Sequence, residues 1–161
     1  MGTRSRIGVM HGDKLKSVYC HWDGYLSHNG QLLQDHYDSA KANHLVALGD
    51  ISSLGKHIGE AHPFSEFDID KNDIDFDKLI ALHDLAKKEG WTTFYGRDRE
   101  ETGVDFTVDQ SYAEFLSKDY DCEYYYIMCD GVWYVGVNRS HDSMVPGQLY
   151  VLSEQLAKVT V

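Results

Sequence analysis

The chain has 161 residues, of which 42% are hydrophobic and 25% charged, a composition typical of a globular protein and not of a disordered one. The length fits one domain with a sizeable core, so we expect residues 1–161 to form a single domain. The formal net charge of −11 argues against direct binding to nucleic acid, which normally requires clusters of Lys and Arg, and no apolar run reaches the roughly 20 residues of a membrane helix.

The first predicted element is a β-hairpin. Residues 4–10 and 15–22 are rich in strand-forming residues, and Gly12 suits the short loop between them. The protein is therefore expected to begin with two antiparallel strands.

The second of these strands mixes polar and apolar side chains. Alternation along the strand predicts that Val18, Cys20 and Trp22 face the core. His21 and Asp23 then lie on the outward face, at the end of the strand. Cys20 is expected to be a core residue and not a nucleophile, because the neighbouring base, His21, points the other way.

A helical region follows the first hairpin. Apolar residues recur at helical spacing from residue 30 to residue 48, with a break near Asp38, so the region forms one long helix or two short ones. Gly49 is expected to end it. Residues 50–55 are predicted to form a turn or a short helical piece.

The middle of the chain is acidic. Residues 60–77 contain seven acidic side chains and one lysine, which predicts an exposed loop. The spacing of Asp68, Asp70 and Asn72 imitates the start of a calcium-binding loop. Asp73 stands where such a loop requires glycine, so no calcium site is expected. The sequence leaves open whether the segment is functional or only solvating.

Three further elements are predicted before the last hairpin. A helix begins within residues 75–77 and ends at Gly90. Residues 91–95 form a strand by composition and run on, still extended, into residues 96–99. A capping box that starts at Ser111 opens a short helix.

The strongest local pattern lies near the C-terminus. Asp130-Gly131 is a two-residue type I′ turn between two runs of strand-forming residues. Closing this hairpin pairs Met128 with Trp133. Residues 148–152 add a strand, and a last short helix follows it.

The order of these elements predicts the fold class. Hairpins near both ends of the chain, with helices between them, indicate an α+β domain. We expect an antiparallel or mixed sheet built from the N- and C-terminal hairpins, which share one sheet, with helices packed on one face. A doubly wound fold is not expected, and no Gly-rich nucleotide-binding loop occurs.

A first candidate binding site is the stretch VYCHWDGYLSHNG, in which His21, Asp23, Tyr25 and His28 lie at the end of the second strand and in the loop after it. Strand ends and the loops after them often carry functional residues, and histidine exchanges protons near neutral pH. The alternative is structural. In that case Asp23 and Gly24 turn the chain, while His21 and Tyr25 are half-buried with satisfied hydrogen bonds.

A second candidate is Arg97-Asp98-Arg99. Two arginines one residue apart on an extended segment point the same way and can hold a carboxylate or a phosphate. Alternatively, Arg97 or Arg99 pairs within the chain, with Asp98, Glu101 or Asp23, and pins a loop. The functional interpretation predicts that residues 97–99 and residues 21–25 are spatial neighbours around a shallow concave site.

The sequence indicates no cofactor and no metal site. Its three cysteines lack CxxC spacing, which disfavours both a disulfide framework and a zinc ribbon. The nine histidines show no spacing that places two of them on one face of an element. A reducing cytoplasm is the simplest setting for such a chain.

Several motifs, in order over nearly the whole chain, carry a resemblance to a known family: MGTRSRIG, YCHWDGY, ALGDISSLG, YGRDR and DGVWYV. The chain resembles a family of small uncharacterised proteins encoded by tailed bacteriophages and prophages. It departs from that pattern at Leu26, where proline is expected, at Glu100, where glycine is expected, and in its acidic middle. The resemblance implies a phage origin and a place in the cytoplasm of the infected bacterium, and it implies no activity.

Two functions are compatible with these observations. The first is a phage accessory protein that is not an enzyme and acts by binding a host protein, in host takeover or anti-defence. The partner could be a basic nucleic-acid-binding protein whose ligand the acidic surface imitates. The second is a small enzyme or ligand-binding module for a phosphorylated or nucleotide-like molecule, with Arg97 and Arg99 holding the anion and His21 and Asp23 nearby. The oligomeric state is not readable from the chain.

Overall fold

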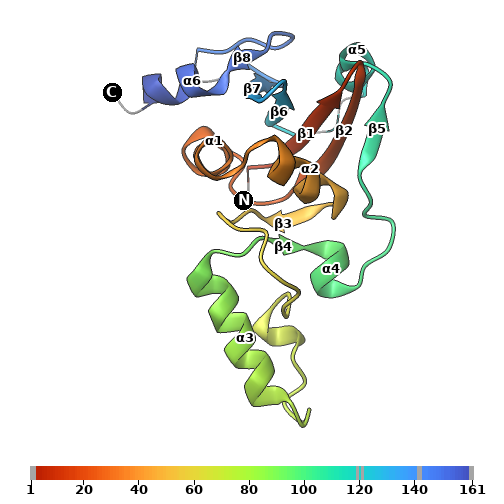
Figure 1. Ribbon diagram of the computed structural model, residues 1–161, viewed down its shortest axis with the longest axis vertical. Coiled ribbons are helices and arrows are strands. Elements are labelled where there is room, and N and C mark those ends of the chain that lie inside the picture. The colour runs from red at the N-terminus through yellow and green to blue at the C-terminus, as the bar shows by residue number, and fades with distance from the viewer. Residues whose placement is uncertain (1–2, 119, 121, 141–142, 160–161) are drawn as a thin grey trace.

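The computed structural model describes residues 3–118, 120, 122–140 and 143–159 (Figure 1). Its strands are β1 (Ser5–His11), β2 (Lys14–Cys20), β3 (Ile51–Ser53), β4 (Thr93–Phe94), β5 (Thr107–Asp109), β6 (Tyr124–Cys129), β7 (Val132–Val137) and β8 (Tyr150–Val151). Its α-helices are α1 (Gln31–His36), α2 (Ser39–Ala47), α3 (Phe76–Glu89), α4 (Tyr95–Arg99), α5 (Tyr112–Ser117) and α6 (Leu152–Val159). Two short turns of other helix types are η1 (Leu26–Gly30), a π-helix, and η2 (Glu66–Asp68), a 3₁₀-helix.

The strands of the described residues form one eight-stranded mixed sheet. Its order is β4-β3-β2-β1-β6-β7-β8, and β5 pairs with β2 beside this path. The two hairpins lie next to each other because β1 pairs in parallel with β6, from Ser5 opposite Tyr124 to Val9 opposite Met128. The predicted α+β fold class is confirmed, and so is the prediction that both hairpins belong to one sheet.

Both hairpins have the predicted turns. The turn at Gly12 connects β1 to β2, and Gly12 has a φ of +61°. In the second hairpin, Asp130 has a φ of +50° and Gly131 a φ of +79°, as a type I′ turn requires at both central positions. Met128 pairs with Trp133, as alternation around this turn predicts.

One face of the sheet carries the main core. Side chains from α1, α2 and α6 pack there against alternate residues of the two hairpins. The predicted interruption of the first helical region is confirmed. Tyr37 separates α1 from α2, and the Asp38 carboxylate caps α2 by accepting from the Lys41 N–H at 2.8 Å. Gly49, with a φ of +91°, follows the end of α2.

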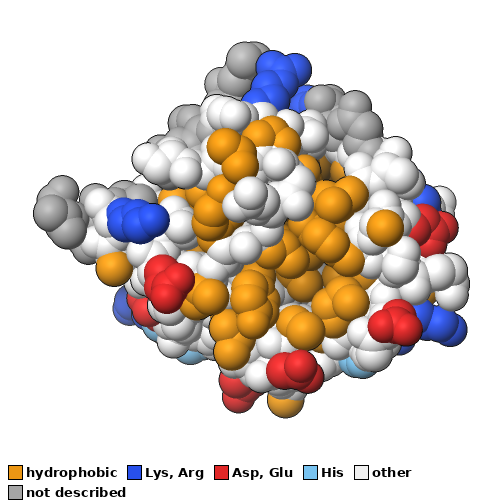
Figure 2. All heavy atoms as spheres, turned by 90° about the horizontal axis from the view of Figure 1, so that it is seen from above, with side chains coloured by type: hydrophobic (Ala, Val, Ile, Leu, Met, Phe, Trp, Pro, Cys, Tyr) orange, Lys and Arg blue, Asp and Glu red, His pale blue; other side chains and the backbone are white. Residues whose placement is uncertain are grey.

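The opposite face of the sheet is covered in part by α5. The capping box forms at Ser111, whose Oγ accepts from the Glu114 N–H at 3.1 Å. Beneath this helix Arg6 is buried, with its guanidinium 3.9 Å from the centre of the Tyr120 ring and a 3.0 Å hydrogen bond from Nε to Ser17 Oγ. Figure 2 shows hydrophobic side chains gathered on the surface seen from above, the end of the molecule where α5, β8 and α6 lie.

The prediction for residues 50–55 was wrong. Residues 51–53 form β3, which pairs with β2 at Cys20 and with β4 at Phe94. The Asp50 carboxylate also accepts the Tyr19 N–H, at 2.9 Å. Three residues carry no strand periodicity of their own, so their conformation is set by neighbours that are distant in sequence.

The helix α3 and the residues before it extend away from the sheet (Figure 1). Gly90 ends this helix with a φ of +72°, as predicted from the sequence. Its apolar face is only partly covered, because Ala86 is buried while the neighbouring Leu85 is 43% exposed. This part of the chain therefore offers the solvent more surface than the rest of the helical layer.

The hydrogen bond between Trp133 and Tyr37 should contribute measurably to the free energy of unfolding. Trp133 is buried and donates from Nε1 to the Tyr37 carbonyl oxygen at 2.9 Å, which ties the second hairpin to the junction of α1 and α2. We expect Trp133→Phe to lower the free energy of unfolding by about 1–3 kcal/mol, because a buried carbonyl loses its donor. Urea unfolding measures this, with Val132→Ala, at a 40% exposed position, as the control. Equal losses in the two variants would contradict the prediction.

Candidate functional site

The segment after β2 turns sharply and is held against the chain before β1. Asp23 takes a φ of +56°, which is uncommon for a residue with a side chain. Gly24 is buried, and its N–H donates to the Thr3 carbonyl oxygen at 2.7 Å. A Cβ at Gly24 would lie 2.8 Å from the same oxygen, so glycine is required for this approach. The turn therefore has a defined backbone conformation that requires glycine at position 24.

The side chains of the first candidate site make local contacts. His21 Nδ1 lies 2.6 Å from the Tyr19 hydroxyl, and its ring meets Trp22 edge-on at 4.7 Å. Tyr25 contacts the His28 ring edge-on, with 6.0 Å between the centroids, and its own side chain remains 39% exposed. His21 is therefore hydrogen-bonded within the chain, as the structural interpretation of this stretch predicts. Tyr25 differs from that interpretation, because much of its side chain faces solvent.

The prediction that Trp22 packs in the core was wrong. Trp22 is 44% exposed, because β2 ends at Cys20 and the chain bends at Trp22, so the alternation of the strand does not continue to that residue. Cys20 is fully buried as predicted. Its environment includes Asn29, an unforeseen buried amide whose Nδ2 lies 3.3 Å from Cys20 Sγ and 3.3 Å from Ser5 Oγ.

The prediction that residues 96–99 are extended was also wrong. They belong to α4, so Arg97 and Arg99 do not point the same way and do not form a clamp. The reason is again tertiary, since the buried Asp98 carboxylate accepts the Phe94 N–H at 2.8 Å and thereby closes the turn after β4. Arg99 is exposed and lies over the Phe64 ring at 4.8 Å.

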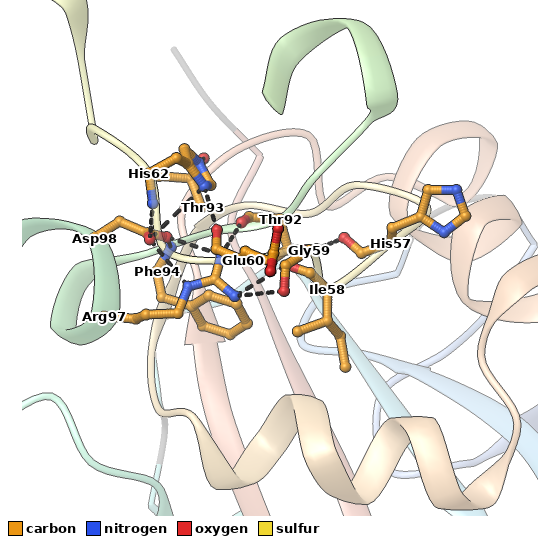
Figure 3. A network of polar contacts seen from close by, with 10 residues as sticks. All are labelled: His57, Ile58, Gly59, Glu60, His62, Thr92, Thr93, Phe94, Arg97 and Asp98. Carbon is orange, nitrogen blue, oxygen red and sulfur yellow. Dashed lines mark hydrogen bonds and ion pairs between the residues drawn. The ribbon is translucent and has the colours of Figure 1, made fainter. Parts of the chain in front are cut away.

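Arg97 uses all five of its N–H donors within the chain (Figure 3). Nη1 donates to the carbonyl oxygens of Ile58 and Gly59 at 3.1 and 3.2 Å, and Nη2 to that of Thr92 at 2.9 Å. Nε and Nη2 donate to the two oxygens of Asp98 at 2.9 and 3.2 Å. The structural alternative for this residue is therefore correct, and no donor remains for an external anion.

Asp98 joins this network to the start of the acidic middle. Its side chain has no exposed surface, and its Oδ1 accepts the His62 N–H at 3.1 Å. The His62 ring lies 2.7 Å from the Glu60 carbonyl oxygen through Nδ1 and 3.1 Å from Thr93 Oγ1 through Nε2. The network thus fastens residues 57–62 to β4 and α4 (Figure 3).

The two candidate groups do not combine into one anion site. In the sheet, β3 lies between β2 and β4, so it separates the strands from which residues 21–25 and residues 97–99 emerge. Each group has its own hydrogen-bond partners in the described part of the chain. The structure gives no support for Arg97 as a partner of His21 and Asp23, because its N–H groups donate to other residues of the chain.

A cavity of about 450 Å³ lies at the end of the sheet where β1 and β6 begin and β2 and β7 end. Of the predicted site residues, Tyr25 lines it. No sequence pattern pointed to the other lining residues, because they follow or precede strands that become neighbours only through the β1–β6 pairing. The described residues that line the cavity are Thr3, Tyr25, Cys122, Glu123, Tyr124, Asn138, Arg139 and Ser140.

A smaller cavity of about 210 Å³ lies between α3 and β4. His62, Thr93 and His83 contribute polar atoms to its lining, and Trp91 contributes an aromatic ring. His62 and Thr93 already bond to each other, so this cavity belongs to the network that fixes residues 57–62.

The acidic segment, residues 60–77, is largely exposed, as predicted, although His62 and Ile69 within it are buried. Its seven carboxylates all belong to exposed residues. Phe67 and Ile74, two large apolar residues within it, are 89% and 98% exposed. Local turns use some of the acidic groups, since Asp70 and Asp73 each accept a backbone N–H two residues further along the chain.

Among the described residues, no group of three or more His, Cys, Asp or Glu side chains is arranged to hold a metal ion. None of the helices in this part of the chain is long and apolar enough to cross a membrane. Comparison with protein-family models, curated proteins and solved structures found no match for this chain.

Replacing Arg97 tests its structural role. We expect Arg97→Ala to lower the free energy of unfolding by roughly 3–5 kcal/mol, because the fully buried Asp98 carboxylate loses its charged partner. Arg99→Ala is the matched control, with an expected loss of about 0.5–1 kcal/mol from its exposed contact with Phe64. Thermal and urea unfolding of both variants measures the difference. Similar losses in the two variants would show that Arg97 does not stabilise the fold through the buried Asp98 carboxylate.

The burial of Cys20 predicts an unreactive thiol. Burial raises the pKa of Cys20 to about 12, so roughly one molecule in ten thousand carries the thiolate at pH 8. We expect iodoacetamide to label the half-buried Cys129 in the folded protein well before Cys20. Peptide mass spectrometry measures the two rates, and labelling in denaturant is the control. Labelling of native Cys20 at the rate of Cys129 would contradict the assignment.

Proposed function

We propose that this chain is a phage-encoded accessory protein that acts by binding a basic host protein in the cytoplasm of the infected bacterium, in host takeover or anti-defence. The phage origin rests on the resemblance of its motifs. The binding function rests on the surface of the acidic segment, in which acidic residues stand directly before and after the exposed Phe67 and Ile74 in the sequence.

The acidic segment has the two properties that a protein-binding surface needs. Seven exposed carboxylates attract a basic partner and orient it during the encounter. Phe67 and Ile74 are almost completely exposed, and large apolar side chains of this kind provide affinity when they enter pockets of a partner. Single exposed apolar side chains are common on protein surfaces, so it is the position of these two between acidic residues that supports a surface for association.

The base of this surface is fixed before any partner arrives. The Asp98 carboxylate accepts a hydrogen bond from the His62 N–H, and Arg97 donates to the carbonyl oxygens of Ile58 and Gly59. On the other side, α3 continues directly from the acidic segment. A segment anchored at both ends loses less conformational freedom on binding than a free loop does.

The alternative, a module that holds an anion with Arg97 and Arg99, has less support. Arg97, the main cation of that module, donates all five of its N–H groups to other residues of the chain. Protein binding is therefore the function that the observations favour.

Neutralising the acidic segment tests this function. We expect the triple variant Glu66→Gln, Asp68→Asn, Asp75→Asn to capture its partner from bacterial lysate at least roughly tenfold more weakly, with a flatter dependence of Kd on salt. These side chains make no capping hydrogen bond, so the fold should be unaffected. Affinity capture with mass spectrometry identifies the partner, and titration of the purified pair measures Kd.

The control changes the net charge by the same amount elsewhere. Asp13, Asp130 and Glu154 are exposed and lie outside the acidic segment, so the variant Asp13→Asn, Asp130→Asn, Glu154→Gln should bind as the wild type does. If both triple variants lose affinity equally, only the total charge matters. If neither loses affinity, the acidic segment is not the binding surface.

A further inference from the structure

The cavity at the end of the sheet has the composition of a small-molecule site that is independent of the acidic segment. Its volume of about 450 Å³ falls within the range of roughly 300–1,000 Å³ that is common for ligand pockets. It is lined by residues from four chain segments: before β1, after β2, at the start of β6 and after β7. We propose that this cavity binds a nucleoside monophosphate.

Tyr25 supplies a surface on which a planar base can stack. Its side chain is 39% exposed at the cavity, although it lies next to buried Gly24 and Leu26. Its carbonyl oxygen accepts the His28 N–H at 3.1 Å and the Gly30 N–H at 3.4 Å, within the π-helical turn η1. The ring is therefore held by a fixed backbone, and stacking on such a ring contributes affinity for any base.

The backbone around Tyr25 has two uncommon features. Asp23 has a positive φ, and η1 is a π-helix, a conformation that is rare and often found at functional sites. Both features lie within five residues of Tyr25 and set the direction in which the chain presents its side chain.

Arg139 supplies the positive charge for a phosphate. It lies just after β7 and is exposed, and no hydrogen bond or ion pair is found for its guanidinium among the described residues. The backbone just before it is held by the Asn138 N–H, which donates to the Glu123 carbonyl oxygen at 3.2 Å. The hydroxyl groups of Thr3 and Ser140 line the same cavity and can donate to phosphate oxygens.

The charged residues limit how many phosphates fit. Among the described residues, the lining contains one cation, Arg139, and one carboxylate, Glu123, whose Oε2 already accepts the Arg4 N–H at 2.7 Å. One arginine in a chain of net charge −11 is too little positive charge for a triphosphate or for a nucleic-acid backbone. A base with one phosphate matches the ring, the cation and the volume together.

Titration with defined probes tests the proposal. The probes are AMP, GMP, CMP and UMP, together with adenosine and inorganic phosphate, and binding is followed by calorimetry and by the NMR signals of the backbone. We expect at least one monophosphate to bind with a Kd below about 1 mM. Arg139→Gln should weaken that binding roughly tenfold and leave adenosine unaffected. Arg99→Gln, the matched exposed arginine away from the cavity, should leave every Kd unchanged.

Substitutions of Tyr25 separate stacking from charge. Tyr25→Ala should weaken the binding of both monophosphates and adenosine, whereas Tyr25→Phe, which keeps the ring, should bind as the wild type does and controls for folding. The proposal is overturned if no monophosphate binds, or if inorganic phosphate alone binds as tightly as the monophosphates. It is also overturned if Arg139→Gln and Arg99→Gln have equal effects. Loss of nucleotide binding without loss of partner capture separates this site from the acidic segment.

Discussion

The parallel pairing of β1 with β6 is the contact on which the rest of the structure depends. It joins two hairpins that are separated by about a hundred residues of sequence, from Ser5 opposite Tyr124 to Val9 opposite Met128. Each hairpin alone would be marginally stable, because a two-stranded ribbon cannot bury an apolar face. Once paired, the hairpins present a continuous surface on which α1, α2 and α6 complete the core.

The same pairing determines where the cavity lies. Parallel strands begin at the same end of a sheet, so the residues before β1 and those at the start of β6 become neighbours. The antiparallel partners β2 and β7 finish at that end, which brings Tyr25 and Arg139 to one cavity. The parallel pairing of β1 with β6 thus brings residues from distant segments of the chain to one cavity.

A second anchor, between Arg97 and Asp98, organises the edge of the sheet at β4. The guanidinium bonds to the backbone of residues 58, 59 and 92, and the carboxylate bonds to that of residues 62 and 94. This arrangement supports the acidic segment at its base and leaves its carboxylates and apolar side chains in solvent. The two candidate surfaces are therefore built by different parts of the fold, and neither depends on the other for its geometry.

The sequence by itself determined the features that depend on near neighbours in the chain. The turns at Gly12 and Asp130-Gly131, the cap at Ser111, the helix end at Gly90 and the exposure of residues 60–77 all follow from local backbone preference, capping or charge. Alternation also identified Cys20 as a core residue, although it failed at Trp22, where the chain bends after the strand has ended.

The tertiary structure alone decided the features that require a distant partner. Residues 51–53 became a strand because β2 and β4 offered hydrogen bonds, and residues 95–99 became helical around a carboxylate buried against another segment. Whether an arginine binds a ligand or its own chain depends on which carbonyl groups surround it, and local pattern does not contain that information. Arg97 is therefore structural while Arg139 lines a cavity, and the difference arises from which segments the β1–β6 pairing and the Asp98 network bring together.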